Sequence, residues 1–400
     1  MTSNALRRSL ALAAFTLLCS EVLAAPKVYV SNFKDNTVSV IDSDSKAVVA
    51  TVPVAAGPHG MGMSRDGRRV FVTGDDSSSM SVIDTASDRV ERTIDVGKSP
   101  HGVALTPDGK TLVVGVYGED RLALVDTASL TVTSTIPVPK PHTISIRPDG
   151  KLAYVASQEP GKFALVIVDL AARSVTGTVP LDKPPRDLEF GAGGKALYFT
   201  RAGVNTIAVL DPASDKIVAE IPTGASPHLA NVFSGATLGT AVVQGPGELL
   251  LFDPATNAPI RSIPVGQQPH WMASSGGRSV WVTNEGSNNV TVVDIQSGQT
   301  TTVAVGNAPR KVVIQSATGA PRVGISNFLF DPSELIVAPA TRVTWINDDG
   351  APHGLRFKDG APGQDLLLPR AEFSRVFDRP GTFDYICSVH PYMSGRIVVR

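Results

Sequence analysis

Apolar and polar residues alternate along most of this chain in short runs that recur with a period of about 42 residues. Each repeat contains a run rich in β-branched residues that ends at an aspartate, such as Val38–Ile41 before Asp42. The aspartates at this position are Asp42, Asp84, Asp126, Asp169, Asp211, Asp253 and Asp294. Because an aspartate side chain readily hydrogen-bonds to the turn backbone that follows it, the pattern predicts a strand end and a turn in every repeat. We interpret these aspartates as structural.

A second strand-like run precedes the aspartate run in most repeats. It reads Val28–Asn32, Val70–Thr73, Ala153–Ala156, Leu197–Thr200 and Val280–Asn284. This sequence pattern resembles the YVTN-type β-propeller repeat, and the resemblance extends to about residue 318. It implies four-stranded blades that must stack on their neighbours to bury their faces.

The phase of the repeats predicts a closed ring. The repeat region begins with the second strand of a blade and ends with a first-strand segment, Ala308–Ile314. That segment would complete the first blade and give seven blades without an open edge. A linear solenoid is the alternative, but it would need capping repeats that we do not find in the sequence.

The C-terminal tail carries a concentrated set of soft metal ligands. Cys387, His390 and Met393 follow one another at spacings of three residues, and His353 lies 34 residues before the cysteine. Two imidazoles and a thiolate, with a weak axial thioether, are the ligands of a blue-copper electron-transfer site. The sequence therefore predicts a copper site at His353, Cys387, His390 and Met393.

The same tail resembles the plastocyanin-type cupredoxins, and most of all the amicyanins, over residues 322–400. The matching segments are Val343–Asn347, Pro352–His353 and Phe383–Val399. The resemblance implies a β-sandwich holding one type-1 copper, with electrons passing through the edge of His390. Pro352, Pro391 and Tyr392 would then form an apolar collar for docking a partner. One position departs from the family, which usually has asparagine after the first histidine where this chain has Gly354.

The two cysteines and the N-terminus favour an exported protein. Arg7 and Arg8, the apolar run Leu10–Leu18 and the small residues up to Ala24 predict a signal peptide over residues 1–24. The apolar run is too short for a membrane span. Export through the general secretory or the twin-arginine route is left open. Removal of the signal leaves one cysteine, and copper ligation explains an unpaired thiol in an oxidising periplasm.

These features predict an all-β protein with a signal peptide (1–24), a seven-bladed β-propeller (25–318) and a C-terminal cupredoxin domain (319–400). The short linker Ala317–Pro321 would keep the copper domain near the propeller. The net charge of −1, with both signs interspersed, argues against nucleic acid as a partner.

The other histidines of the mature chain share one position of the repeat, directly after a proline. They are His59, His101, His142, His228 and His270, and the two remaining repeats have Arg186 and Arg310 there. We call these seven residues the mouth cluster, because they are expected to meet in a circle at one mouth of the central channel. The sequence leaves three roles open for them: structural packing, anion binding, and a second site for a metal.

The leading functional interpretation is a periplasmic electron carrier with one type-1 copper. Its redox partner would be a dehydrogenase or a cytochrome, and the propeller would serve as a docking platform. Whether the chain is also an enzyme is left open. The first alternative is a copper oxidoreductase with a second site at the mouth cluster, resembling nitrous oxide reductase in architecture, although that family needs two cysteines in its cupredoxin. A lactonase-type hydrolase is a weaker alternative, since no distinctive carboxylate set is present.

Overall fold

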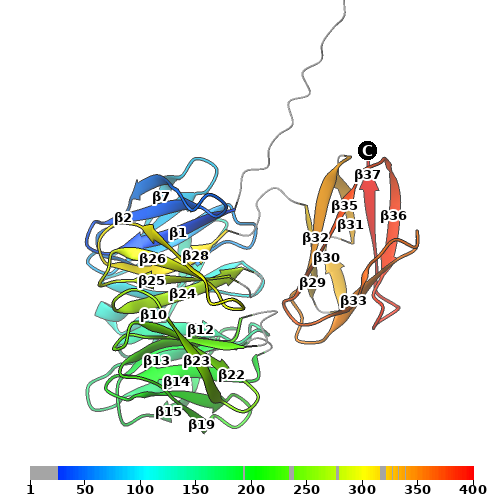
Figure 1. Ribbon diagram of the computed structural model, residues 1–400. Helices are drawn as coiled ribbons and strands as arrows, with labels where there is room; N and C mark the ends of the chain where they lie inside the picture. Colours follow the sequence, from blue (N-terminus) through cyan, green and yellow to red (C-terminus); the bar gives the residue numbers. More distant parts are fainter. Residues whose placement is uncertain are drawn as a thin grey trace, which may run out of the picture.

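The computed structural model of the protein describes residues 26–400 except 192–193, 234–237, 276–278, 316–320, 327, 332 and 338. The expected signal peptide and most of the expected linker lie outside the described residues. Within the described part there is no α-helix, and seven four-stranded antiparallel sheets are followed by two further sheets (Figure 1). The predicted all-β fold is confirmed.

Six blades each use four strands that are consecutive in the chain. They are β4 (Pro58–Met63), β5 (Arg69–Gly74), β6 (Ser79–Asp84), β7 (Arg89–Asp95); β8 (Pro100–Leu105), β9 (Thr111–Val116), β10 (Arg121–Asp126), β11 (Thr131–Pro137); β12 (Pro141–Ile146), β13 (Leu152–Ser157), β14 (Ala164–Asp169), β15 (Ser174–Pro180); β16 (Pro185–Phe190), β17 (Leu197–Arg201), β18 (Thr206–Asp211), β19 (Lys216–Pro222); β20 (Pro227–Asn231), β21 (Gly239–Val243), β22 (Glu248–Asp253), β23 (Ala258–Pro264); and β24 (Pro269–Ser275), β25 (Ser279–Asn284), β26 (Asn289–Asp294), β27 (Thr300–Ala304). A single turn of 3-10 helix, η1 (Tyr117–Glu119), links β9 to β10.

The seventh blade joins the two ends of the repeat region. It contains β1 (Lys27–Asn32), β2 (Thr37–Asp42), β3 (Val48–Pro53) and β28 (Pro309–Ile314) in the order β28-β1-β2-β3. Val312 of β28 lies opposite Val30 of β1, and β28 packs against the first strands of both neighbouring blades. The predicted ring closure is confirmed.

Neighbouring blades share their apolar cores. The middle strands of a blade are buried along almost their whole length, whereas its fourth strand is mostly exposed. One core cluster, for example, joins Phe71 and Met80 of one blade to Leu112 and Val114 of the next. A blade therefore buries its faces only by stacking, as the repeat pattern predicts.

The repeating aspartates serve the turns, as predicted. Asp42 accepts hydrogen bonds from the backbone N–H and the hydroxyl of Ser45, both at 2.8 Å. These bonds hold the pKa of the Asp42 carboxyl below its ordinary value. The other six aspartates each accept a backbone N–H from two or three residues further along the chain.

The tail folds into a β-sandwich with its own core. One sheet has the order β30-β29-β32-β35 and the other β31-β37-β36-β33-β34. The strands are β29 (Arg322–Ser326), β30 (Leu329–Asp331), β31 (Glu334–Val337), β32 (Thr341–Asn347), β33 (His353–Phe357), β34 (Gln364–Leu367), β35 (Glu372–Phe377), β36 (Gly381–Ile386) and β37 (Ser394–Val399). Trp345 is fully buried at the centre, with its ring near those of Phe357, Phe377 and Tyr385.

The tail contacts the propeller at the end of the channel away from the mouth cluster. Each innermost strand begins at a Pro-His or Pro-Arg pair and runs to the opposite end, where the loop after β4 carries Arg65. Arg65 forms an ion pair with Asp348, which follows β32 of the sandwich. In Figure 1 the sandwich accordingly lies beside the propeller.

Candidate metal centre

Two segments of the sandwich bring the predicted ligands together. His353 is the first residue of β33, and Cys387 directly follows β36. His390 and Met393 lie on the short loop between β36 and β37. This loop closes on itself, because the Cys387 N–H donates to the Met393 carbonyl at 3.1 Å and the Met393 N–H donates to the His390 carbonyl at 2.9 Å.

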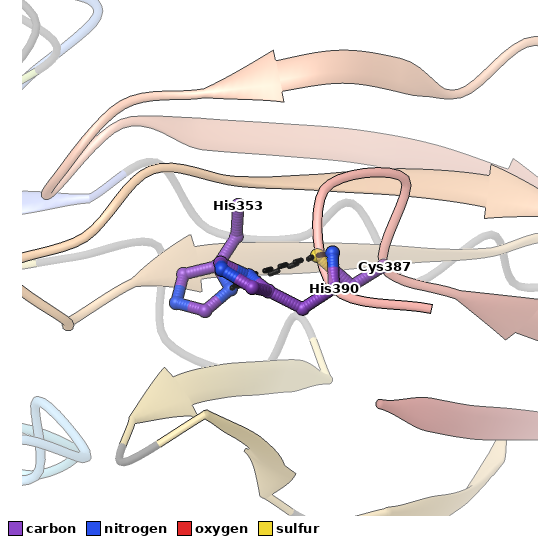
Figure 2. A group of neighbouring side chains, drawn as sticks. All are labelled: His353, Cys387 and His390. Carbon is purple, nitrogen blue, oxygen red and sulfur yellow. Dashed lines mark hydrogen bonds between the residues drawn. The ribbon is translucent and has the colours of Figure 1, made fainter. Parts of the chain in front are cut away.

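Three donor atoms converge in this loop region. The Cys387 Sγ lies 3.7 Å from His353 Nδ1 and 3.8 Å from His390 Nδ1, and the two Nδ1 atoms are 3.3 Å apart. Figure 2 shows the sulfur and the two imidazoles gathered at one point. Donors held in one plane about 2.1 Å from a common ion would be separated by roughly 3.6 Å. The three side chains therefore fit a trigonal metal site.

The tautomer of His353 also suits a metal. Its Nε2 lies 2.8 Å from Asp349 Oδ2, and the same oxygen accepts the backbone N–H of Phe328 at 2.9 Å. Because the carboxylate is the acceptor, Nε2 carries the proton and Nδ1 keeps its lone pair toward Cys387. A ligating histidine typically donates its other N–H to such a group. Burial lowers the pKa of His353, although Asp349 opposes the shift.

Burial differs among the predicted ligands. Cys387 and His353 are fully buried and Met393 is 2% exposed, whereas His390 is partly exposed. The predicted copper ligands thus reach the protein surface only through the edge of His390. Met393 lies on the ligand loop and packs in the same apolar core as Cys387.

An exposed apolar rim surrounds His390. Pro352 and Pro391 are exposed, and Tyr392 is 73% exposed with its ring 5.9 Å from that of His390. The sequence did not point to Phe328, whose ring lies 5.0 Å from His390 and 5.4 Å from His353. Phe328 has a left-handed φ of 58°, which is uncommon for a bulky residue.

The departure at Gly354 has a steric reason. A Cβ at this position would lie 1.9 Å from the Ser388 hydroxyl and 2.4 Å from the Asp365 carbonyl oxygen. The Ser388 hydroxyl instead donates to that carbonyl at 2.7 Å, which ties the cysteine loop to β34. Here a serine steadies the loop from the cysteine side, and the residue after His353 has no room for a side chain.

The imidazoles of the mouth cluster lie together, as predicted. His101 lies between His59 and His142, with ring centroids 3.9 Å from each, and His228 lies 4.1 Å from His270. The two groups meet where His59 and His270 are 5.5 Å apart. No three donor atoms of the mouth cluster lie within 4.8 Å of one another, whereas those of His353, Cys387 and His390 do.

The two arginines lie close enough to the imidazoles to lower the pKa of His270, and each also bonds to a residue of a neighbouring loop. Arg186 donates to the Ser226 hydroxyl at 3.2 Å, and Arg310 pairs with Glu285 at 3.2 Å while stacking over Phe33. Their guanidinium groups thus turn to neighbouring loops, where acceptors and an aromatic face are available.

Burial keeps four histidines of the mouth cluster neutral. It lowers the pKa of His59, His101 and His270 well below the ordinary value, and it lowers that of His142 to about 4. Neighbouring imidazoles and arginines add to the lowering at His59 and His270. These side chains therefore carry lone pairs rather than charge at neutral pH.

Comparisons with known proteins match two different families in the N-terminal and C-terminal parts of the chain. Residues 13–111 match the family described as YNCE-like beta-propeller, and residues 317–400 match the copper binding proteins of the plastocyanin/azurin family. Amicyanin-alpha from Methylorubrum extorquens is 33% identical over 105 residues, which are 25% of this chain and 87% of that protein. Amicyanin from Paracoccus denitrificans is 35% identical over 89 residues, or 21% of this chain and 68% of the relative.

Among solved structures, Kuenenia stuttgartiensis hydrazine synthase matches with a TM-score of 0.62 and 20% sequence identity. The match covers 71% of this chain and 99% of that chain, and at this identity it supports the fold alone. The part of the chain that the structure describes has no helix with the length and apolar character of a membrane span.

Proposed function

Because the chain belongs, through its C-terminal domain, to the plastocyanin/azurin family of copper binding proteins, we propose that it is a periplasmic electron-transfer protein with one type-1 copper. His353, Cys387, His390 and Met393 would hold the metal. Copper in such a site supplies a one-electron couple. The observation that carries the proposal is the convergence of two Nδ1 atoms and one Sγ, 3.3 to 3.8 Å apart.

The surroundings of the three donors suit electron transfer rather than substrate chemistry. His353 and Cys387 are fully buried, so a substrate cannot reach these two side chains. The partly exposed His390 is the ligand at the surface, and electrons would leave through its edge. A partner would dock on the rim of Pro352, Phe328, Pro391 and Tyr392.

The propeller would add a second surface to this carrier. A copper domain of this family needs only its own sandwich to hold the metal, since its core contains residues of the tail alone. The propeller is then free to act as a platform for the redox partner, which we propose to be a dehydrogenase or a cytochrome. Export to the periplasm would require the signal peptide expected over residues 1–24.

Replacing Tyr392 by lysine tests the docking rim. Electron self-exchange brings the His390 edges of two copies together, so a lysine at the rim would place like charges face to face. We expect self-exchange, measured by NMR line broadening at low ionic strength, to slow at least tenfold, which corresponds to about 1.4 kcal/mol. Tyr392→Phe is the matched control and should exchange at the wild-type rate.

The visible spectrum of Tyr392→Lys should stay unchanged, because the substitution leaves the donors in place. If wild-type and lysine proteins exchange electrons equally fast, the transfer surface lies elsewhere on the molecule.

Replacing Met393 by glutamine tests the axial ligand. The axial group tunes the potential of a type-1 site, and an amide oxygen stabilises the oxidised metal better than a thioether does. We expect the blue colour to persist and the reduction potential, measured by redox titration, to fall. Met393→Leu, which keeps the volume but removes the donor, should raise it. A potential that is the same in all three proteins would exclude Met393 as a ligand.

A further inference from the structure

We propose that His59, His101 and His142, at the mouth of the propeller, bind a second transition-metal ion of a kind that prefers imidazole ligands. This site is separate from the one in the tail. These three imidazoles lie in succession at one end of the channel, with centroid spacings of 3.9 Å. The proposal does not depend on copper in the tail.

Hydrogen bonds fix the tautomers of two of these histidines. His101 Nδ1 lies 3.1 Å from the backbone carbonyl of His142, and His142 Nδ1 lies 3.1 Å from the carbonyl of Arg186. A carbonyl oxygen can only accept, so each Nδ1 carries the proton of a neutral imidazole. Each Nε2 is therefore unprotonated, and its lone pair is available to bind a metal.

This arrangement is the one that metal-binding histidines usually show. A ligating imidazole typically donates its other N–H to a backbone carbonyl or a carboxylate, which fixes the ring for the metal. Carbonyls serve His101 and His142 in this way, and the Asp187 carboxylate lies 2.6 Å from Nδ1 of His228. Burial raises the pKa of Asp187, but His228 outweighs it and holds that pKa below its ordinary value.

The same tautomers disfavour an anion at this position. An anion needs N–H donors, whereas the free nitrogens of His101 and His142 are acceptors. His59 and His101 are each 7% exposed, and burial keeps both in the neutral form that binds metals. Imidazole ligands suit copper and zinc, with copper(II) bound more tightly.

Binding requires movement of side chains but not of the sheets. Three donor atoms of the mouth cluster do not yet lie within 4.8 Å of one another. His59 makes no hydrogen bond through its ring among the described residues, so rotation of this imidazole breaks none. We therefore place the third ligand at His59 and the fixed pair at His101 and His142.

The experiment uses the full chain with the tail site removed. In the double variant Cys387→Ala/His390→Ala, metal analysis after dialysis and calorimetric titration with Zn²⁺ and Cu²⁺ report the mouth alone. We expect one equivalent of each ion to bind, Cu²⁺ more tightly than Zn²⁺, and Mg²⁺ not to bind. Adding His101→Gln and His142→Gln should weaken Zn²⁺ binding at least tenfold, with far-UV circular dichroism confirming the fold.

Arg186→Gln in the same background separates a metal from an anion. Arg186 forms no ion pair with a carboxylate in the described part of the chain, so its charge repels a cation and attracts an anion. Removing it should leave Zn²⁺ binding as tight or tighter. Absence of a Zn²⁺ equivalent in the double variant would overturn the proposal, and so would phosphate binding that is lost with Arg186. Neither result would affect the blue site, which wild-type protein reports separately through its colour.

Discussion

Replacing Cys387 by alanine is expected to remove the intense visible absorption of the copper-loaded protein completely. That absorption is the thiolate-to-copper band of type-1 sites, and Cys387 supplies the only thiolate in the described part of the chain. Tight copper binding in the tail should be lost as well, because only two imidazoles and a weak thioether would remain at that site. The measurements are the absorption spectrum and the copper content of the protein after dialysis against a mild chelator.

Cys387→Ser separates colour from binding. The hydroxyl occupies nearly the same volume in this fully buried position, so the sandwich should fold. Oxygen does not produce the intense band, and the serine protein should be colourless even where some copper stays bound. Wild-type protein that takes up copper in the tail without becoming coloured would refute a type-1 site.

Replacing Val312 by aspartate should open the propeller. Val312 is 1% exposed in β28 and lies opposite Val30, where the last strand of the repeat region closes the first blade. Burying an unpaired carboxylate there is among the most damaging of single changes, and we expect a loss of about 4 kcal/mol or more in the free energy of unfolding. Urea titration followed by circular dichroism measures it.

The tail supplies an internal control for this experiment. Its core has no residue from the propeller, so the blue band should survive at urea concentrations that unfold the Val312→Asp propeller. Thr301→Asp, on the exposed fourth strand of the neighbouring blade, introduces the same charge without burial and should cost less than about 0.5 kcal/mol. Equal stability of the two aspartate proteins would mean that β28 does not hold the ring closed.

The copper loop could be predicted from sequence because its ligands are neighbours in the chain. Cys387, His390 and Met393 share one tight turn, so their spacing alone restricts their geometry. The histidine that completes the site, His353, stood out because its Pro-His pair follows a strand-like run. The seven blades were predictable for a related reason, since a repeat displays the same pattern seven times.

Contacts made by packing were not predictable in the same way. Asp349 reaches His353 only because the turn after β32 folds back over β33, although a carboxylate four residues before a ligand histidine is a signal worth testing. Phe328 comes from the hairpin between β29 and β30, and nothing near it in sequence relates it to His390.

The direction of β28 has a consequence for how this protein can be engaged. The strand begins beside the histidines at Pro309 and ends at Ile314 on the far side of the disc, and the copper domain follows from there. Its ion pair between Asp348 and Arg65 belongs to that far side. The copper domain therefore does not block access to the histidines of the mouth cluster. One molecule can therefore bind at the mouth cluster while a redox partner binds the copper domain on the opposite side. The two binding events are sterically compatible, so a ternary complex can form.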